Sequence, residues 1–256
     1  AMLGAFSLCL GQTPRDAARL QILGAARVVC VGNLKFSAAP LPADAEMLES
    51  FRRALAMRPR WLAASTHAGE EAVVAEAHRR LNQRAGDVVT FIAPRHPERG
   101  PEIVALLASL GLKTAQRSLG QALEADTQVY LADTIGELGL WYRLAEVVFV
   151  GGSLTAPGGH NPLEPARLGA AVLYGPGMSS FAEIAAGMRA AGASRTVADA
   201  GELADAVGKL LFDDATGRRA MAAAAKAYAE SEAGALERVL DALAPLTAAL
   251  DKRSAA

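Results

Sequence analysis

The chain has 256 residues, of which 52% are hydrophobic, and a formal net charge of −1. This length suits one large domain or one and a half, with ample apolar residues for a core. A near-neutral charge without a basic block argues against nucleic acid as the main partner, and no apolar run is long enough to span a membrane. Cys9 and Cys30, the only cysteines, indicate neither a metal cluster nor a disulfide framework, so a reducing, cytoplasmic compartment is expected.

Residues 1–40 differ in kind from the rest of the chain. Strands are predicted at Phe6–Leu10 and Val28–Val31, with a helix between them that Thr13 can cap. One such unit is too small to form a domain. We therefore expect residues 1–40 to be the end of a separate domain with its linker, and residues 41–250 to form the main domain.

Beyond the linker, short β-branched runs alternate with amphipathic helical stretches. The predicted strands are Trp61–Ser65, Val88–Ile92, Thr114–Arg117, Val129–Ala132, Val147–Val150, Val172–Tyr174 and Arg195–Val197. The predicted helices are Glu70–Arg84, Glu98–Leu110, Ile135–Leu144, Leu163–Leu168, Phe181–Ala191 and Ala200–Leu211, and residues 213–250 are expected to add a helical cap. This alternation predicts an α/β fold with a Rossmann-like, doubly wound parallel sheet. Because ligands bind such sheets at the carboxyl ends of the strands, the functional loops should follow Ser65, Ile92, Ala132 and Val150.

The stretch 149–166 reads as a buried strand, a loop with two glycine pairs and the start of a helix. Asn161 can cap this helix, Pro162 suits its first position and Glu164 completes a capping box. The N–H groups and positive dipole of such a helix start favour an anion, phosphate above all. Glu164 is also placed to accept both hydroxyls of a ribose, and the cap leaves His160 unexplained.

Two further loops carry candidate ligand contacts. Arg95 and His96 follow a predicted strand, where Arg95 can hold a phosphate with two donors and His96 can donate to phosphate or sugar. The alternative is a plain helix entry with Pro97 as its first residue. His67 follows another strand and is a candidate for substrate contact, although a lone histidine is more often structural.

The segment after the strand at 129–132 has a structural interpretation as well as a functional one. Thr134 and Glu137 match a capping box, which explains both residues without a ligand. Gly136 has no such explanation, because glycine weakens a helix, and it could let a nucleobase approach the backbone. Lys35 could supply a positive charge to a phosphate, although alone it would more often be a solvated lysine.

Several common signatures are missing from the sequence. It contains no G-x-G-x-x-G, P-loop, H-E-x-x-H or G-x-S-x-G motif, and no D-x-D pair to carry a divalent metal. A phosphate would therefore be held by arginine, lysine and helix dipoles, with neither metal nor cofactor.

Taken in order, the motifs of the chain resemble those of the 3-deoxy-D-manno-octulosonic acid (Kdo) transferases of lipopolysaccharide biosynthesis, which are GT-B glycosyltransferases. The resemblance rests on Gly32–Phe36, Ala64–Glu71, Ala93–Arg99, Asp133–Glu137, Phe149–Ser153 and, most specifically, Gly158–Pro165. It covers the C-terminal, donor-binding half of an architecture in which an acceptor domain comes first. The family's general base, a glutamate of that acceptor domain, and its membrane-anchoring segment have no counterpart in this chain.

The resemblance implies roles for individual residues. The CMP part of CMP-Kdo would be bound by Pro94, Arg95, Ile135, Gly136, Glu137, Asn161, Pro162, Leu163 and Glu164. Lys35 would stabilise the phosphate charge that develops in the transition state, and His67 and His96 are further carried-over contacts.

The implied reaction is a metal-independent, inverting transfer of Kdo from CMP-Kdo to a lipid A precursor. The full enzyme is expected at the cytoplasmic face of the bacterial inner membrane, which it would reach through the absent N-terminal part. This donor-binding portion is expected to be soluble and inactive alone. The alternatives are a GT-B enzyme or epimerase that uses a UDP-sugar, and a non-catalytic nucleotide-binding module.

Overall fold

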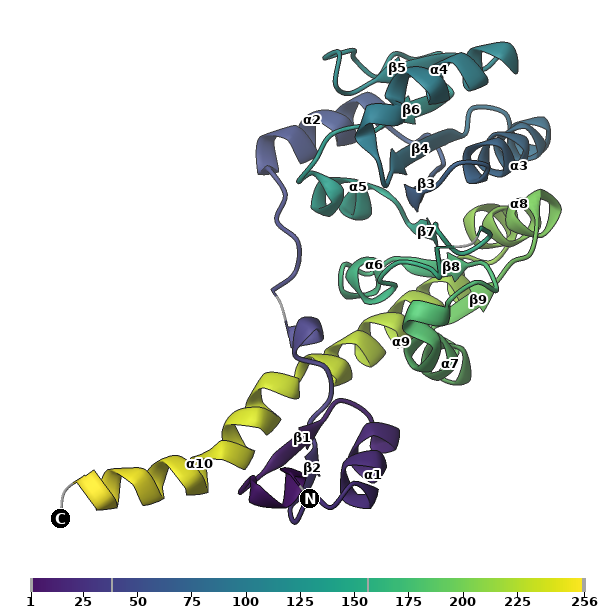
Figure 1. The fold of residues 1–256 in the computed structure, drawn as a ribbon. Coiled ribbons are helices and arrows are strands. Elements are labelled where there is room, and N and C mark those ends of the chain that lie inside the picture. Colours follow the sequence, from purple (N-terminus) through teal and green to yellow (C-terminus); the bar gives the residue numbers. More distant parts are fainter. Residues whose placement is uncertain (1, 38, 156, 255–256) are drawn as a thin grey trace. The chain divides into compact units, whose positions relative to one another are not determined.

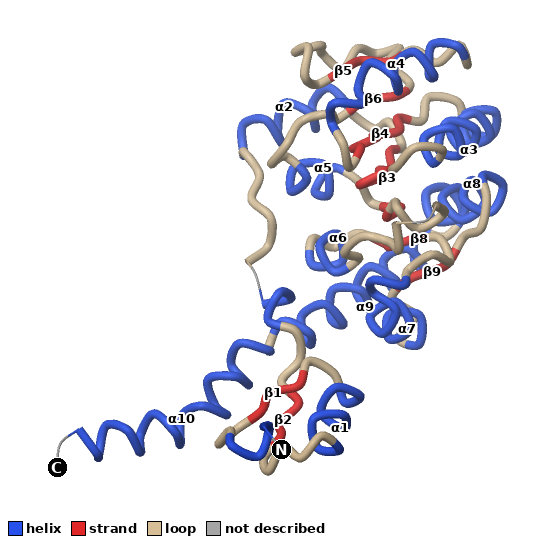
Figure 2. The backbone as a smooth tube through the Cα atoms, in the orientation of Figure 1, coloured by secondary structure: helices blue, strands red, loops and turns tan. Residues whose placement is uncertain are grey.

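The computed structural model describes residues 2–37, 39–155 and 157–254 (Figures 1 and 2). Contacts within the described chain divide it into two compact units, formed by residues 1–39 with 229–256 and by residues 40–228. The sequence analysis assigned residues up to 250 to the main domain, whereas the structure groups 229–250 with the N-terminal residues. The reason is a small apolar cluster in which Val31 packs against Val239 and Ala242.

The first unit contains a short parallel strand pair. Its elements are η1 (Met2–Ala5), β1 (Cys9–Gly11), α1 (Pro14–Ile22), β2 (Val28–Cys30), η2 (Leu34–Ser37) and α10 (Ala235–Ser254). The predicted cap is confirmed, since Thr13 Oγ1 accepts a hydrogen bond from the N–H of Asp16 at 3.0 Å. Arg238 Nε donates to the carbonyl oxygen of Val31 at 2.9 Å, and this bond ties α10 to the N-terminal segment.

The second unit is built on a sheet of seven parallel strands within the described residues, in the order β5-β6-β4-β3-β7-β8-β9. The strands are β3 (Arg60–Thr66), β4 (Val89–Pro94), β5 (Thr114–Gln116), β6 (Val129–Leu131), β7 (Val147–Val150), β8 (Ala171–Tyr174) and β9 (Ser194–Thr196). The predicted doubly wound parallel sheet is confirmed. After β3, the chain places β4, β5 and β6 on one side of that strand. It then crosses to β7 on the other side, so the switch in strand order lies between β3 and β7.

Helices cover both faces of this sheet (Figure 1). They are α2 (Ala45–Leu55), α3 (Glu70–Ala85), η3 (Pro97–Arg99), α4 (Gly100–Ser109), α5 (Leu138–Leu144), α6 (Leu163–Arg167), η4 (Ser179–Phe181), α7 (Ala182–Ala190), α8 (Ala200–Gly208), the π-helical η5 (Lys209–Asp213) and α9 (Ala215–Ala233), which continues into the first unit. On one face, α3, α4 and α8 pack on alternate strand residues such as Trp61 and Ile92. On the other, Phe51 and Trp141 pack against Phe91 and Tyr130. No described helix has the length and apolar character that crossing a bilayer requires.

Two differences from the predicted helices affect the site. The sequence analysis did not predict α2, which begins directly after the proline-containing linker because Asp44 caps it through the N–H of Met47 at 2.8 Å. Helix α5 begins at Leu138 instead of Ile135, since Gly136 has a left-handed backbone with φ +88°. Both differences shape the loop at Gly136 that is described below.

Candidate functional site

Three loops meet at the carboxyl edge of the sheet, where β3 lies between β4 and β7. Beyond the regular pairing, the N–H of Arg95 donates to the carbonyl oxygen of Thr66 at 3.0 Å. On the other side, the N–H of Gly151 donates to the carbonyl oxygen of Ala64 at 2.8 Å. The strand order therefore brings together the loops predicted after Ser65, Ile92 and Val150.

Glu70, the first residue of α3, organises the glycine loop after β7. Its side chain is fully buried. Its carboxylate accepts hydrogen bonds from the N–H groups of His67, Gly152, Ser153 and Leu154, at 2.7 to 3.0 Å. The N–H groups of Gly152, Ser153 and Leu154 are therefore occupied by the protein's own carboxylate and are not available to an external anion. The anion site predicted at the start of the following helix stays a prediction.

Glu71 fixes the neighbouring loop in a similar way. It is fully buried, and its carboxylate accepts from the Thr66 hydroxyl at 2.9 Å and from Arg99 Nη1 at 2.8 Å. Bonds to Glu102 and Glu71 raise the pKa of Arg99 above its ordinary value. The sequence analysis treated Glu70 and Glu71 only as an acidic helix start. The signal in the sequence was the pair of adjacent acids directly after Gly69, close to the end of a strand.

The predicted histidines form a cluster. His67 Nε2 and His160 Nε2 are 2.8 Å apart in rings that are nearly parallel, and the His96 ring meets His67 edge-on at a centroid distance of 5.6 Å. A hydrogen bond between two Nε2 atoms requires one ring to donate and the other to accept, so the accepting ring is neutral. Gly152 has φ +65°, and a Cβ there would lie 3.0 Å from the His160 ring. The glycine therefore makes room for the pair.

Burial favours the neutral form of both rings in this pair. Burial is the main cause that lowers the pKa of His67 and that of His160. The positive charge of Arg95 lowers the pKa of both rings, whereas the negative charge of Glu70 raises it. The side chain of Arg95 is exposed, whereas Pro94 is buried at the end of β4. Arg95 thus adds an exposed positive charge in the loop that follows β4, the strand next to β3.

The start of α6 lies one residue later than the predicted cap, because Pro162 is the residue before the helix and makes no side-chain cap; Asn161 forms local bonds instead. Asn161 Oδ1 accepts from the N–H of Leu163 at 3.1 Å, and Asn161 Nδ2 donates to Glu164 Oε1 at 3.2 Å. Burial raises the pKa of Glu164 above its ordinary value. Pro162 and Leu163 are buried, so their side chains belong to the core and only their backbone can meet a ligand. Glu164 is half-buried and keeps part of its carboxylate accessible.

The predicted capping box at Thr134 is wrong. Its hydroxyl donates to the carboxylate of Glu137, which itself directly precedes α5 and forms no side-chain cap to the backbone. Glu137 instead pairs with Arg117, whose Nη2 and Nε lie 2.7 and 3.0 Å from its two carboxylate oxygens. Arg117 is the main cause that lowers the pKa of Glu137. Ile135 is 88% exposed, so the loop presents an apolar side chain and the Gly136 backbone to solvent.

A cavity of about 180 Å³ lies beside Gly136. Pro42, Met47 and Leu140 contribute apolar walls, so both the linker and the unpredicted α2 take part in it. Arg143 holds the linker on α5 by donating to the carbonyl oxygen of Leu41 at 2.7 Å.

Lys35 lies in η2 of the first unit, and its side chain is outside what the structure describes. Its predicted role stays a prediction. Over the described ranges of the chain, no three His, Cys, Asp or Glu side chains are grouped to hold a metal ion.

Comparison with known proteins decides the family. No family model matches the chain. The 3-deoxy-D-manno-octulosonic acid transferase of Bordetella pertussis is 37% identical over 241 residues, which cover 91% of this chain and 55% of the relative. The C-terminal CMP-Kdo binding domain of WaaA from Acinetobacter baumannii is 34% identical with a TM-score of 0.68, over 77% of this chain and 98% of that domain. The chain belongs to the 3-deoxy-D-manno-octulosonic acid transferase family.

Other relatives agree in family and in fold. The Kdo transferase of Haemophilus influenzae is 36% identical over 73% of this chain and 44% of its own length. A UDP-N-acetylglucosamine 2-epimerase from Listeria monocytogenes, at 18% identity and a TM-score of 0.63, shares the fold alone. The fold is thus the Rossmann-like α/β fold of GT-B glycosyltransferase domains. The chain spans about half the length of the Kdo transferases that it matches.

Proposed function

We propose that the second unit is the CMP-Kdo-binding part of a Kdo transferase. The observation that carries this proposal is the pair of His67 and His160 at the switch point of the sheet, anchored by buried Glu70, with Arg95 in the adjoining loop after β4. Its support is the match over 98% of the Acinetobacter baumannii domain, which binds CMP-Kdo.

Each part of the site has a role in this proposal. Arg95 binds the phosphate of the donor with its guanidinium, and His67 and His160 add donors to the phosphate or the sugar. Glu164, oriented by Asn161, accepts the ribose hydroxyls. The Gly136 backbone and the adjacent apolar cavity receive the base.

In the proposed reaction, a hydroxyl of a lipid A precursor attacks the anomeric carbon of Kdo while the bond from that carbon to the phosphate oxygen breaks. The bond's electron pair leaves with CMP, and the configuration inverts. Negative charge grows on the phosphate, so donors aimed at it stabilise the transition state more than the ground state. Arg95 supplies one such donor, and Lys35 is proposed as a second.

The general base that takes the acceptor's proton is proposed, from the family resemblance, to belong to the acceptor domain. The full enzyme is proposed to act at the cytoplasmic face of the inner membrane. We therefore expect this chain alone to bind the donor without transferring Kdo.

Calorimetric titration with CMP and with UMP tests the proposal. We expect saturable CMP binding and a clear preference over UMP. Arg95→Gln should weaken CMP binding by about tenfold to a hundredfold, since it removes charge-assisted bonds to the phosphate. Arg79→Gln is the matched control, because Arg79 is an exposed α3 arginine that pairs with Glu76. Absence of CMP binding, or a preference for UMP, would contradict the proposal; the latter would favour a UDP-sugar enzyme.

A further inference from the structure

An arginine-rich cleft of about 330 Å³ lies at the amino edge of the sheet, the edge opposite the donor loops. Arg60 begins β3, Glu146 directly precedes β7, and Leu168 and Gly169 precede β8; these three strands are neighbours. In the described part of the chain, α2, β3, α5 and α9 supply the arginines that line it, namely Arg52, Arg60, Arg143, Arg218 and Arg219. We call this feature the arginine cleft.

Backbone carbonyl groups hold two of these side chains in place. Arg60 Nε donates to the carbonyl oxygen of Leu144 at 2.9 Å, and Arg60 Nη1 to that of Arg58 at 3.2 Å. Arg143 Nη1 donates to the carbonyl oxygens of Leu41 and Gly139, both at 2.7 Å. A carbonyl oxygen satisfies a donor without cancelling its charge. Arg60 and Arg143 are therefore positioned and still positive.

Carboxylates balance only part of the charge of the cleft. Glu146 pairs with Arg218 at 2.8 Å, and among the described lining residues it is the only carboxylate. Glu49, on the same helix as Arg52, pairs with it at 2.6 Å. Five guanidinium groups thus face two carboxylates. A concave surface with one sign of charge and low-dielectric walls concentrates ions of the opposite sign.

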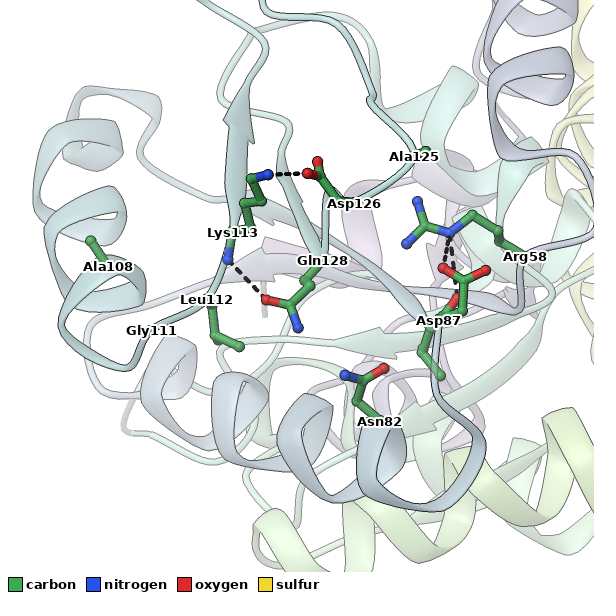
Figure 3. A pocket seen from close by; sticks show the side chains of 11 residues that line it. Arg58, Asn82, Asp87, Ala108, Gly111, Leu112, Lys113, Ala125, Asp126 and Gln128 are labelled. Carbon is green, nitrogen blue, oxygen red and sulfur yellow. Dashed lines mark hydrogen bonds and ion pairs between the residues drawn. The ribbon is translucent and has the colours of Figure 1, made fainter.

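A larger cavity at the same edge, of about 640 Å³, shows the contrast (Figure 3). There Arg58 pairs with Asp87 and Lys113 with Asp126, as the dashed lines in Figure 3 mark. These four side chains neutralise one another, so the pocket gives no electrostatic reason for a charged ligand. Among the described residues of the arginine cleft, such compensation is only partial.

We propose that the arginine cleft binds a phosphate-bearing ligand. The planar guanidinium fork matches the oxygens of a phosphate and can bind them with two parallel hydrogen bonds. Arg52 and Arg219 are exposed at the cleft, where they can close on a ligand that Arg60 and Arg143 receive. The phosphate comes either from an anionic lipid headgroup or from a free phosphorylated molecule. The proposal is independent of the donor site, because the two sites lie at opposite edges of the sheet.

Calorimetric titration of the whole chain with inorganic pyrophosphate tests this proposal. The informative variant is Arg52→Gln with Arg219→Gln, because in the described part of the chain the hydrogen bonds of both side chains stay within their own helices. We expect this double variant to weaken saturable pyrophosphate binding by about tenfold. Arg79→Gln with Arg80→Gln removes the same charge from exposed α3 positions outside the cleft and should change binding by at most about twofold.

Two results would overturn the proposal. One is the absence of saturable binding, and the other is equal weakening in the two double variants. Because pyrophosphate can also bind at the donor site, Arg95→Gln is measured in parallel; loss of all binding in Arg95→Gln would equally overturn it.

Co-sedimentation with vesicles then identifies the source of the phosphate. If phosphatidylglycerol vesicles, and not phosphatidylcholine vesicles, bind the chain in a manner that needs Arg52 and Arg219, the ligand is a lipid headgroup. If only pyrophosphate binds in that manner, the ligand is a free phosphorylated molecule. Each of these two results supports the proposal.

Discussion

The two edges of the sheet anchor charged side chains to the backbone in opposite ways. At the carboxyl edge, the buried carboxylates of Glu70 and Glu71 accept hydrogen bonds from groups of the protein itself and are therefore not available to a ligand. At the amino edge, Arg60 and Arg143 donate to carbonyl oxygens and keep their charge. A ligand at the carboxyl edge thus meets Arg95 together with histidines that are neutral at pH 7 and become charged at lower pH. The amino edge presents arginines, whose charge does not depend on pH, and this difference can be tested.

The largest expected effect is at Glu70. Glu70→Ala leaves the N–H groups of Gly152, Ser153 and Leu154 buried without their acceptor. We expect it to lower the free energy of unfolding by about 4 kcal/mol and to abolish CMP binding, because the loop that carries His160 loses its anchor. Urea denaturation and calorimetry measure the two effects. Glu76→Ala, at an exposed α3 acid, is the control; a Glu70→Ala variant that behaves like it would refute the anchoring role.

The next largest effect is the dependence of stability on pH, which is expected to come from a histidine in the core and not from the two edges of the sheet. His78 is buried between α3 and β4, where its Nδ1 bonds to Thr90 Oγ1 at 2.9 Å, and burial lowers its pKa to about 4. In the unfolded chain, His78 therefore binds a proton below about pH 6.5, whereas in the folded chain it binds one only near pH 4. Stability should fall as the pH falls through this window, and His78 should account for about 2 kcal/mol of the loss between pH 7.5 and pH 5.

His78→Gln can keep a hydrogen bond to Thr90 and removes the titration. Urea denaturation at pH 7.5 and pH 5 should show that the variant loses about 2 kcal/mol less of its free energy of unfolding than the wild type. Equal losses in both proteins would show that His78 does not control the acid response.

The histidine pair should couple donor binding to a proton. The pKa values of His67 and His160 are lowered, so both rings are neutral at pH 7. A phosphate anion that replaces their mutual hydrogen bond stabilises an imidazolium and so raises its pKa. The negative charges of Glu70 and Glu71 act in the same direction, whereas Arg95 and His96 oppose it. Binding should then take up a proton, and CMP affinity should rise by about threefold to tenfold from pH 8 to pH 6.5.

Calorimetry in buffers of different ionisation enthalpy counts this proton. His160→Asn should retain CMP binding and reduce the uptake, which separates the pair's proton from any taken up by the nucleotide. An unchanged proton count in His160→Asn would argue against the coupling, even if CMP binding itself is confirmed.

The smallest effect is expected at the half-buried pair of Arg117 and Glu137. Arg117→Gln should lower the free energy of unfolding by about 1 kcal/mol or less at pH 7. Because the pair lowers the pKa of Glu137, its contribution is present above the ordinary glutamate pKa and is lost as the pH falls through the depressed value. A carboxyl NMR titration should show the pKa of Glu137 return toward its ordinary value in the variant; no change would refute the ion pair.

The sequence by itself determined the elements and the edge at which the proposed site lies. Strand β7 has the predicted bounds Val147–Val150, and Thr13 caps α1 as expected, because apolar periodicity and caps depend on neighbours within a few residues. Strand alternation was enough to predict a parallel sheet, and with it the carboxyl ends of the strands as the place of the functional loops.

Only the tertiary structure decided which side chains meet. Glu70 accepts hydrogen bonds from backbone N–H groups more than eighty positions away in the sequence. His67 contacts His160 across the switch point, and Glu137 pairs with Arg117, the residue that follows β5. The arginine cleft likewise draws its residues from four elements. Such contacts depend on strand order, which local periodicity does not encode. A buried acid and a solvated one also look alike in sequence, since their difference lies in whether distant backbone N–H groups replace water.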